Sequence, residues 1–122
     1  MARIKKGTLE AVTLAARNVY PNEFLALLSS KKNGNTIDEF VLAPAIYGKT
    51  FSSIRLDLVP YDSNIMGSVH SHPIGRAMPS RADLRAFRAM GETNLIIASP
   101  FNLGSFRAFN KTGKEIKIEV IE

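Results

Sequence analysis

The sequence predicts an α/β fold in which a mixed β-sheet is flanked by helices. Two segments have the apolar spacing of amphipathic helices, one near the start of the chain and one that opens at Ser80. Short apolar or alternating segments of strand length lie between and after these helices. The chain has 122 residues, the length of one typical domain, so we expect residues 1–122 to form a single domain.

The first helix is expected over residues 7–20. Its apolar residues fall at i, i+3, i+7 and i+10 and therefore share one face: Leu9, Val12, Ala16 and Val19. Pro21 should end this helix, because the residue before a proline is disfavoured in the α region.

The next segment, residues 24–28, is apolar throughout and predicts a buried strand that starts near Glu23. Asn33 and Gly34 form a dipeptide that is typical of turns. Two more strands are expected before the second helix, at residues 37–42 and 51–59, and a short apolar segment, residues 65–69, leads the chain to His70.

The second helix follows a loop, residues 73–79, that is interrupted by proline and glycine. Ser80 opens this helix, and Gly91 stands where a C-terminal cap belongs. Its apolar residues share one face: Leu84, Phe87 and Met90. Strands are expected in the rest of the chain at residues 95–99, 105–110 and 115–121. The last of these alternates apolar and charged residues, as a half-solvated edge strand does.

The composition excludes several classes of protein. The chain has no cysteine, which excludes disulfides, thiolate metal sites and cysteine nucleophiles. Its apolar runs are far shorter than the ~20 residues of a membrane helix, and no apolar signal-peptide core follows the basic start, so we expect a cytoplasmic protein. The net charge of +5 favours an acidic partner, but the charges are scattered, and we expect no nucleic-acid binding.

The chemistry of the chain centres on its only two histidines, His70 and His72. On an extended segment, residues i and i+2 point to the same side, so the two imidazoles could converge on one ion. The pair alone is equally compatible with two exposed loop histidines.

A carboxylate follows at the first turn of the second helix, where Asp83 stands three residues after Ser80. Catalytic zinc sites usually have three protein ligands, and without a third histidine or a cysteine the third ligand has to be a carboxylate. Ser-x-x-Asp before an apolar segment is also a helix capping arrangement, with the aspartate favoured by the helix dipole. The two roles are compatible, because a carboxylate has two oxygens.

The spacing of these residues resembles a known motif. His70-x-His72, seven residues, Ser80, two residues and Asp83 match the motif of the JAMM metallopeptidases, also called the MPN or JAB family. Glu23 stands where that family has its upstream glutamate. The resemblance covers nearly the whole order of elements and implies a JAMM/MPN-like, cytidine-deaminase-like fold of the compact prokaryotic type.

The chain departs from the family pattern at two places that are not motif residues. Ala26 stands where the family often has a glycine, and Gly67-Ser68-Val69 stands where it often has an aromatic residue. These departures concern strand packing and the shape of the pocket.

The resemblance also implies a function. It implies a zinc ion (Zn2+) held by His70, His72 and Asp83, with Glu23 as general acid/base and Ser80 as a hydrogen-bond donor to the oxyanion. The substrate class that it implies is a ubiquitin-like modifier or a sulfur-carrier protein, cut after the C-terminal diglycine as a peptide or an isopeptide bond.

Two alternatives remain within the same resemblance. One is a non-catalytic MPN module that only binds partners, although such modules typically lose one or more ligands. The other is a DNA-repair-associated JAB relative, which carries an additional helical region that this chain is not expected to contain. A zinc deaminase is excluded, because it needs Cys-x-x-Cys ligands. Four arginines near the site in the sequence, Arg76, Arg81, Arg85 and Arg88, are expected to form a solvated face rather than a substrate clamp, although an acidic protein partner could use them. The sequence leaves the modifier and the oligomeric state open.

Overall fold

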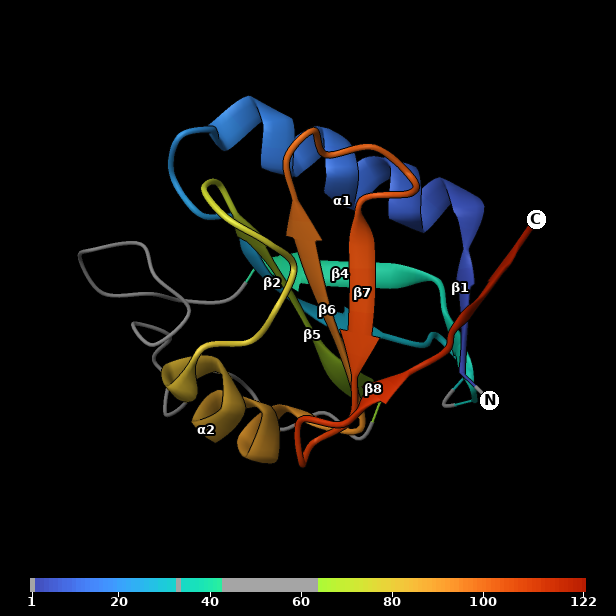
Figure 1. Cartoon of the computed structure of the whole chain (residues 1–122). Helices are drawn as coiled ribbons and strands as arrows, with labels where there is room; N and C mark the ends of the chain where they lie inside the picture. Colours follow the sequence, from blue (N-terminus) through green and yellow to red (C-terminus); the bar gives the residue numbers. More distant parts are fainter. Residues whose placement is uncertain (1, 33, 43–63) are drawn as a thin grey trace.

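The computed structural model describes residues 2–32, 34–42 and 64–122 and has a mixed sheet with one helix on each face (Figure 1). The helices are α1 (Lys6–Val19) and α2 (Arg81–Met90). The main sheet has the strand order β4 (Glu39–Leu42), β2 (Leu25–Ser29), β5 (Ile65–His72), β6 (Thr93–Ala98), β7 (Phe106–Phe109) and β8 (Glu115–Ile116). A smaller sheet has the order β3 (Thr36–Ile37), β1 (Arg3–Lys5) and β9 (Glu119–Ile121).

The pairing within the main sheet is antiparallel except between β5 and β6. Parallel strands need a crossover connection, and α2 supplies it between β5 and β6. This crossover places the start of α2 near the carboxyl end of β5, where both histidines lie. The predicted α/β fold with a mixed sheet and two helices is therefore confirmed.

The first helix ends as its sequence predicts. Tyr20 caps it with an extended backbone, φ −51° and ψ 135°, the conformation favoured before Pro21. The predicted inner face is buried at Leu9, Val12 and Ala16. The assignment of Val19 to that face was wrong: this side chain is 37% exposed, because it lies in the last turn, where the chain turns back towards the sheet.

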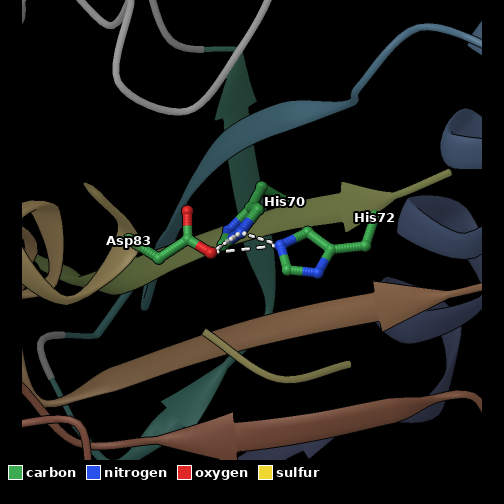
Figure 2. Close-up of side chains that lie close together, drawn as sticks. All are labelled: His70, His72 and Asp83. Carbon is green, nitrogen blue, oxygen red and sulfur yellow. Dashed lines mark hydrogen bonds and ion pairs between the residues drawn. The ribbon is translucent and has the colours of Figure 1, made fainter. Parts of the chain in front are cut away.

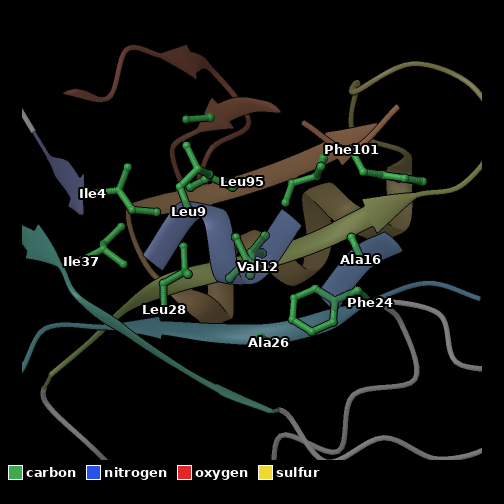
Figure 3. Close-up of a cluster of buried hydrophobic side chains, with 13 residues drawn as sticks. Ile4, Leu9, Val12, Ala16, Phe24, Ala26, Leu28, Ile37, Leu95 and Phe101 are labelled. Carbon is green, nitrogen blue, oxygen red and sulfur yellow. The ribbon is translucent and has the colours of Figure 1, made fainter. Parts of the chain in front are cut away.

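Two hydrophobic cores lie on the two faces of the sheet. Along β2 the side chains alternate between them, with Ala26 and Leu28 in the core under α1 and Leu25 and Leu27 in the core under α2. Figure 3 shows the first of these cores, where Val12 of α1 lies over the sheet. A strand that is covered on both faces has no polar side, which explains why residues 24–28 are apolar throughout.

Two predicted strands are each divided between the two sheets. Residues 37–42 were expected as one strand, but β3 pairs with β1 in the small sheet and β4 pairs with β2 in the main sheet. Residues 115–121 are divided in the same way between β8 and β9. Both single-strand predictions were wrong, because apolar alternation is a local property and does not reveal which neighbour a residue pairs with.

The other differences between the predicted and the observed elements are smaller. The strand β1 was not expected, since it has three residues, two of them basic, with only Ile4 buried. The departure at Gly67 has a packing reason, because a Cβ there would collide with the backbone carbonyl of Thr93 in β6. The strand expected at residues 51–59 lies outside the described residues.

The described part of the chain contains no helix that is long and apolar enough to cross a membrane.

The second helix has the predicted caps, with Ser80 at its N-terminus and Gly91 at its C-terminus. Gly91 has a φ of 138° and its α-carbon faces the Met66 carbonyl, so the end of α2 packs against the start of β5.

Candidate metal centre

The strand β5 carries both histidines at its carboxyl end. The apolar segment noted in the sequence stops at Val69, but the observed strand continues to His72, because β6 supplies register partners up to Ala98 opposite His72. The extended backbone places His70 and His72 on the same face, the one covered by α2. The ring of His70 is fully buried and lies 6.3 Å, between ring centroids, from Phe87 of α2.

Three side-chain atoms meet at this point, as Figure 2 shows. The Nε2 atoms of His70 and His72 are 3.1 Å apart. The Oδ2 atom of Asp83 lies 3.2 Å from Nε2 of His70 and 3.1 Å from Nε2 of His72. The side chains of His70 and Asp83 are buried, and that of His72 is 17% exposed. The cluster is thus open to solvent on the His72 side.

The cluster fits a zinc ion. In tetrahedral zinc sites the metal–ligand distances of about 2.0–2.1 Å place neighbouring ligand atoms about 3.3 Å apart. The three distances between the ligand atoms are close to this value. Two imidazoles and one carboxylate also form a usual donor set for zinc with one position left open.

The carbonyl oxygen of Arg76 orients His72. Its distance to Nδ1 of His72 is 2.9 Å, and since a carbonyl only accepts, Nδ1 must carry the hydrogen and donate it. In the neutral ring the lone pair is then on Nε2, the atom that faces Asp83. A backbone acceptor of this kind is a common outer partner of a metal-binding histidine.

The electrostatics of the cluster favour a negative carboxylate beside positive charge. Burial by itself raises the pKa of the Asp83 carboxyl, but hydrogen bonds with His70 and His72 outweigh it and hold that pKa well below its usual range. The hydrogen bond with Asp83 raises the pKa of His72 against the opposing effect of burial. A bound cation would supply the same positive charge.

Ser80 and Asp83 form the capping box that the sequence offers as an alternative to a metal site. The backbone N–H of Asp83 donates to Oγ of Ser80 at 3.1 Å. The backbone N–H of Ser80 donates to Oδ2 of Asp83 at 2.9 Å, and this is the oxygen that faces both histidines. Capping and a place in the cluster therefore coexist. The Ser80 residue is exposed, and the bond that it accepts leaves its own hydroxyl proton available.

Glu23 lies beside the cluster through the pairing of β2 with β5. Leu25 is the register partner of His70 in this antiparallel pair, so two residues further along Glu23 comes next to His72. Glu23 is half-buried, and its charge contributes to the raised pKa of His72. The structure thus brings together all five residues of the motif.

Ser71 and the backbone carbonyl of Arg76 contribute to this arrangement, and neither role was predicted from the sequence. Ser71 is fully buried, and its Oγ accepts the backbone N–H of Phe24 at 2.7 Å, while its own N–H donates to the Phe24 carbonyl at 3.0 Å. A serine between two histidines on a strand points to the opposite face, which could have marked it as a buried polar group. Arg76 acts through its backbone carbonyl, for which no sequence signal exists. Arg76 and the arginines of α2, Arg81, Arg85 and Arg88, are exposed as expected.

Comparisons with known proteins agree with this fold and this cluster. The Prok-JAB family, described as prokaryotic homologs of the JAB domain, matches residues 5–111. A probable metalloprotease from Haloferax volcanii is 30% identical over 128 residues, which covers 98% of this chain and 79% of that protein.

Two solved structures are similar over almost their full length. A JAB1/MPN domain protein from Archaeoglobus fulgidus is 31% identical with a TM-score of 0.78, covering 98% of this chain and 99% of that one. A structure described as JAMM, a metalloprotease-like zinc site in the proteasome and signalosome, is 30% identical with a TM-score of 0.79, covering 100% and 99%.

These relatives and the His-His-Asp cluster agree on a metallopeptidase type of domain with a site that fits zinc. The resemblance noted in the motif is confirmed at the level of the family. The chain belongs to the Prok-JAB family, the prokaryotic homologs of the JAB domain.

Proposed function

We propose that this protein is a zinc-dependent peptidase or isopeptidase that cuts after the C-terminal diglycine of a ubiquitin-like modifier or a sulfur-carrier protein. His70, His72 and Asp83 would hold the zinc ion, Glu23 would be the general acid/base, and Ser80 would stabilise the oxyanion. The observation that carries this proposal is the convergence of Nε2, Nε2 and Oδ2 within 3.2 Å of one another.

Zinc, when bound, supplies a Lewis acid that polarises a carbonyl and lowers the pKa of water to about 7. The proton of the attacking water needs an acceptor, and Glu23 lies beside His72, two residues before the start of the neighbouring strand β2. This carboxylate would take the proton and then pass it to the nitrogen of the leaving amine.

The proposed role of Ser80 uses its hydroxyl proton. Its lone pair accepts the helix-capping bond from Asp83, so the proton can point to a carbonyl oxygen that becomes negative during the reaction. The cap also holds Oγ in place, which limits the reorganisation needed in the transition state.

The proposed substrate class is supported by the family and by the steric demand of the site. Glycine has no Cβ, so a diglycine tail can bring its backbone close to a partly buried centre that would exclude bulkier residues. Most of the binding energy would come from the folded body of the modifier and would position the tail.

The test uses the purified chain loaded with zinc and a diglycine-tailed modifier fused to a reporter. We expect cleavage after the diglycine, complete loss with chelator, and complete loss in Glu23→Gln, whose amide cannot accept the proton. The Glu23→Gln protein should keep stoichiometric zinc in elemental analysis. Cleavage by this variant, or its loss of zinc, would contradict the role of Glu23.

The same experiment separates the alternatives. A non-catalytic module would bind the modifier and cut nothing, with or without zinc. Equal digestion of casein and of the diglycine fusion would keep the zinc peptidase and remove the modifier as its specific substrate. All five motif residues are present and lie together, which favours the enzyme over the binding module.

A further inference from the structure

A pocket of about 480 Å³ lies beside the candidate metal centre. The loop between β5 and α2 forms one wall, and the end of β6 with the start of β7 forms the other. Its lining residues on the loop are Gly75, Arg76, Ala77 and Met78. Those on the strand side are Ala98, Ser99, Gly104, Ser105, Phe106 and Arg107.

Two residues that line the pocket, Arg76 and Ala98, also lie next to His72 of the centre. The carbonyl of Arg76 accepts the hydrogen bond that orients His72, and Ala98 is the register partner of His72 in β6. A peptide whose cleaved bond is held near His72 would therefore extend from the centre into or past this pocket. None of the three candidate metal ligands lines it.

The lining combines positive charge with apolar surface. Arg76 and Arg107 are both exposed, and no carboxylate occurs among the described residues that line the pocket. Arg107 donates to Sδ of Met78 at 3.4 Å, a weak contact that places its guanidinium next to the opposite wall. Its ion pair with Glu115 is 3.7 Å long and half-exposed, so it is weak and exchangeable. Met78 itself remains 44% exposed.

We propose that this pocket binds the substrate segment next to the cleaved bond, and that Arg76 and Arg107 select a segment with an acidic side chain. The occupant follows from charge complementarity: the lining contains two arginines and no carboxylate, which favours a carboxylate ligand, and the exposed side chain of Met78 offers apolar surface to a neighbouring residue. This inference rests on the proposed peptidase function and adds a specificity to it.

The test is a titration that does not depend on turnover. The zinc-loaded Glu23→Gln protein, labelled with ¹⁵N, is titrated with two synthetic peptides that contain Gly-Gly. The peptides are identical except that one has glutamates and the other glutamines at the residues on either side of the diglycine. Amide shifts locate each peptide, and their concentration dependence yields Kd.

We expect the acidic peptide to shift the amides of residues 75–78 and 104–107 and to bind more tightly than the neutral peptide. Arg76→Gln and Arg107→Gln should each raise the Kd of the acidic peptide about twofold to fivefold, and the double variant should raise it about tenfold or more. The Kd of the neutral peptide should stay the same. Arg76→Gln keeps the carbonyl that orients His72, so the zinc content should stay the same.

The control is Arg88→Gln, which removes one exposed arginine from the last turn of α2. That end of α2 packs against the start of β5, at the opposite end of the strand from His72. Equal Kd for both peptides, absence of shifts at the pocket, or an equal effect of Arg88→Gln would overturn the inference. Failure of the peptidase itself would show separately, as absence of cleavage of the diglycine fusion by the unmodified protein.

Discussion

Single atoms of Asp83, Ser80 and Ser71 connect the secondary structure of this protein with its candidate centre. Oδ2 of Asp83 accepts the backbone N–H of Ser80 and also faces both histidines. Oγ of Ser71 accepts the N–H of the residue that follows Glu23. Substitutions at these residues are therefore expected to affect both stability and the proposed chemistry, and both have to be measured on the same variant.

Ser80 illustrates how the two effects can be separated. Ser80→Ala removes the cap and should lower the free energy of unfolding by about 0.5–2 kcal/mol. Ser80→Gly should lower it by only about 0.3 kcal/mol, because glycine is tolerated at the N-cap. If the hydroxyl stabilises the oxyanion, both variants should lose about 10²–10³ in kcat and keep zinc. Thermal melts, elemental analysis and kinetics on the two proteins test this. A rate that falls only in the alanine variant would mean that Ser80 is a cap alone.

Ser71 should hold Glu23 in position opposite His72. Ser71→Ala leaves the buried N–H of Phe24 without its acceptor, which should cost about 1–3 kcal/mol of stability and lower kcat while zinc stays bound. Ser68→Ala is the matched control, since Ser68 is also fully buried on β5 and donates to Oδ1 of Asn94 at 2.7 Å, away from the cluster. Equal loss of kcat in both variants would reduce the effect of Ser71 to general stability.

Among the elements, β5 has the tightest packing around it and contributes most to the candidate centre. It lies between β2 and β6, carries both histidines, and is approached so closely by β6 that Gly67 has no room for a side chain. The crossover by α2 then returns the chain beside the same strand with Asp83 in its first turn. The centre thus depends on the spacing between β5 and β6 as much as on the ligands themselves.

Gly67 provides a test of that spacing. Gly67→Ala would place a methyl group against the Thr93 carbonyl and should destabilise the protein by about 1–3 kcal/mol, with weaker zinc binding as the strands move apart. Gly7→Ala is the control in the first turn of α1, where a Cβ meets nothing within 4 Å, and should stabilise by up to about 1 kcal/mol. Chemical denaturation of both variants measures these changes in the free energy of unfolding. An unchanged stability of Gly67→Ala would contradict the close approach of β6 to Gly67.

On the scale of the whole molecule, the candidate ligands come from two elements, the carboxyl end of β5 and the first turn of α2, and meet only in the folded state. Zinc binding should therefore stabilise the fold, because the unfolded chain offers no preformed site. We also propose that residues 1–122 unfold as one domain.

The expected effect of zinc can be measured by calorimetry. Free zinc at 100 times its Kd should add about 2.7 kcal/mol, or roughly 10 °C in Tm, in a single transition. Chelator should reverse the shift, and His72→Ala should abolish it, since two ligands rarely hold catalytic zinc. Magnesium, which prefers oxygen ligands, should leave Tm unchanged and serves as the control ion. A Tm that is independent of zinc would contradict the zinc site.

Much of this protein could be predicted from local patterns in its chain. The apolar spacing before Pro21 located α1, the Ser80 and Gly91 caps located α2, and the apolar run after Glu23 located β2. Each of these signals depends on residues within a few positions of one another, which is the range over which backbone preferences and periodicity act. The motif residues could also be named, because their spacing is a property of the sequence.

The pairing partners required the folded chain. Whether residue 37 or residue 39 joins the main sheet depends on pairing with β1 or β2, which lie outside that segment of the sequence. The carbonyl of Arg76 and the hydroxyl of Ser71 have no sequence pattern of their own, since their role depends on what packs against them. Local periodicity determines which face of an element is apolar, but long-range packing determines which elements meet. The residues of the centre were therefore visible in the chain, and their contacts, and the pocket beside them, follow from the tertiary fold.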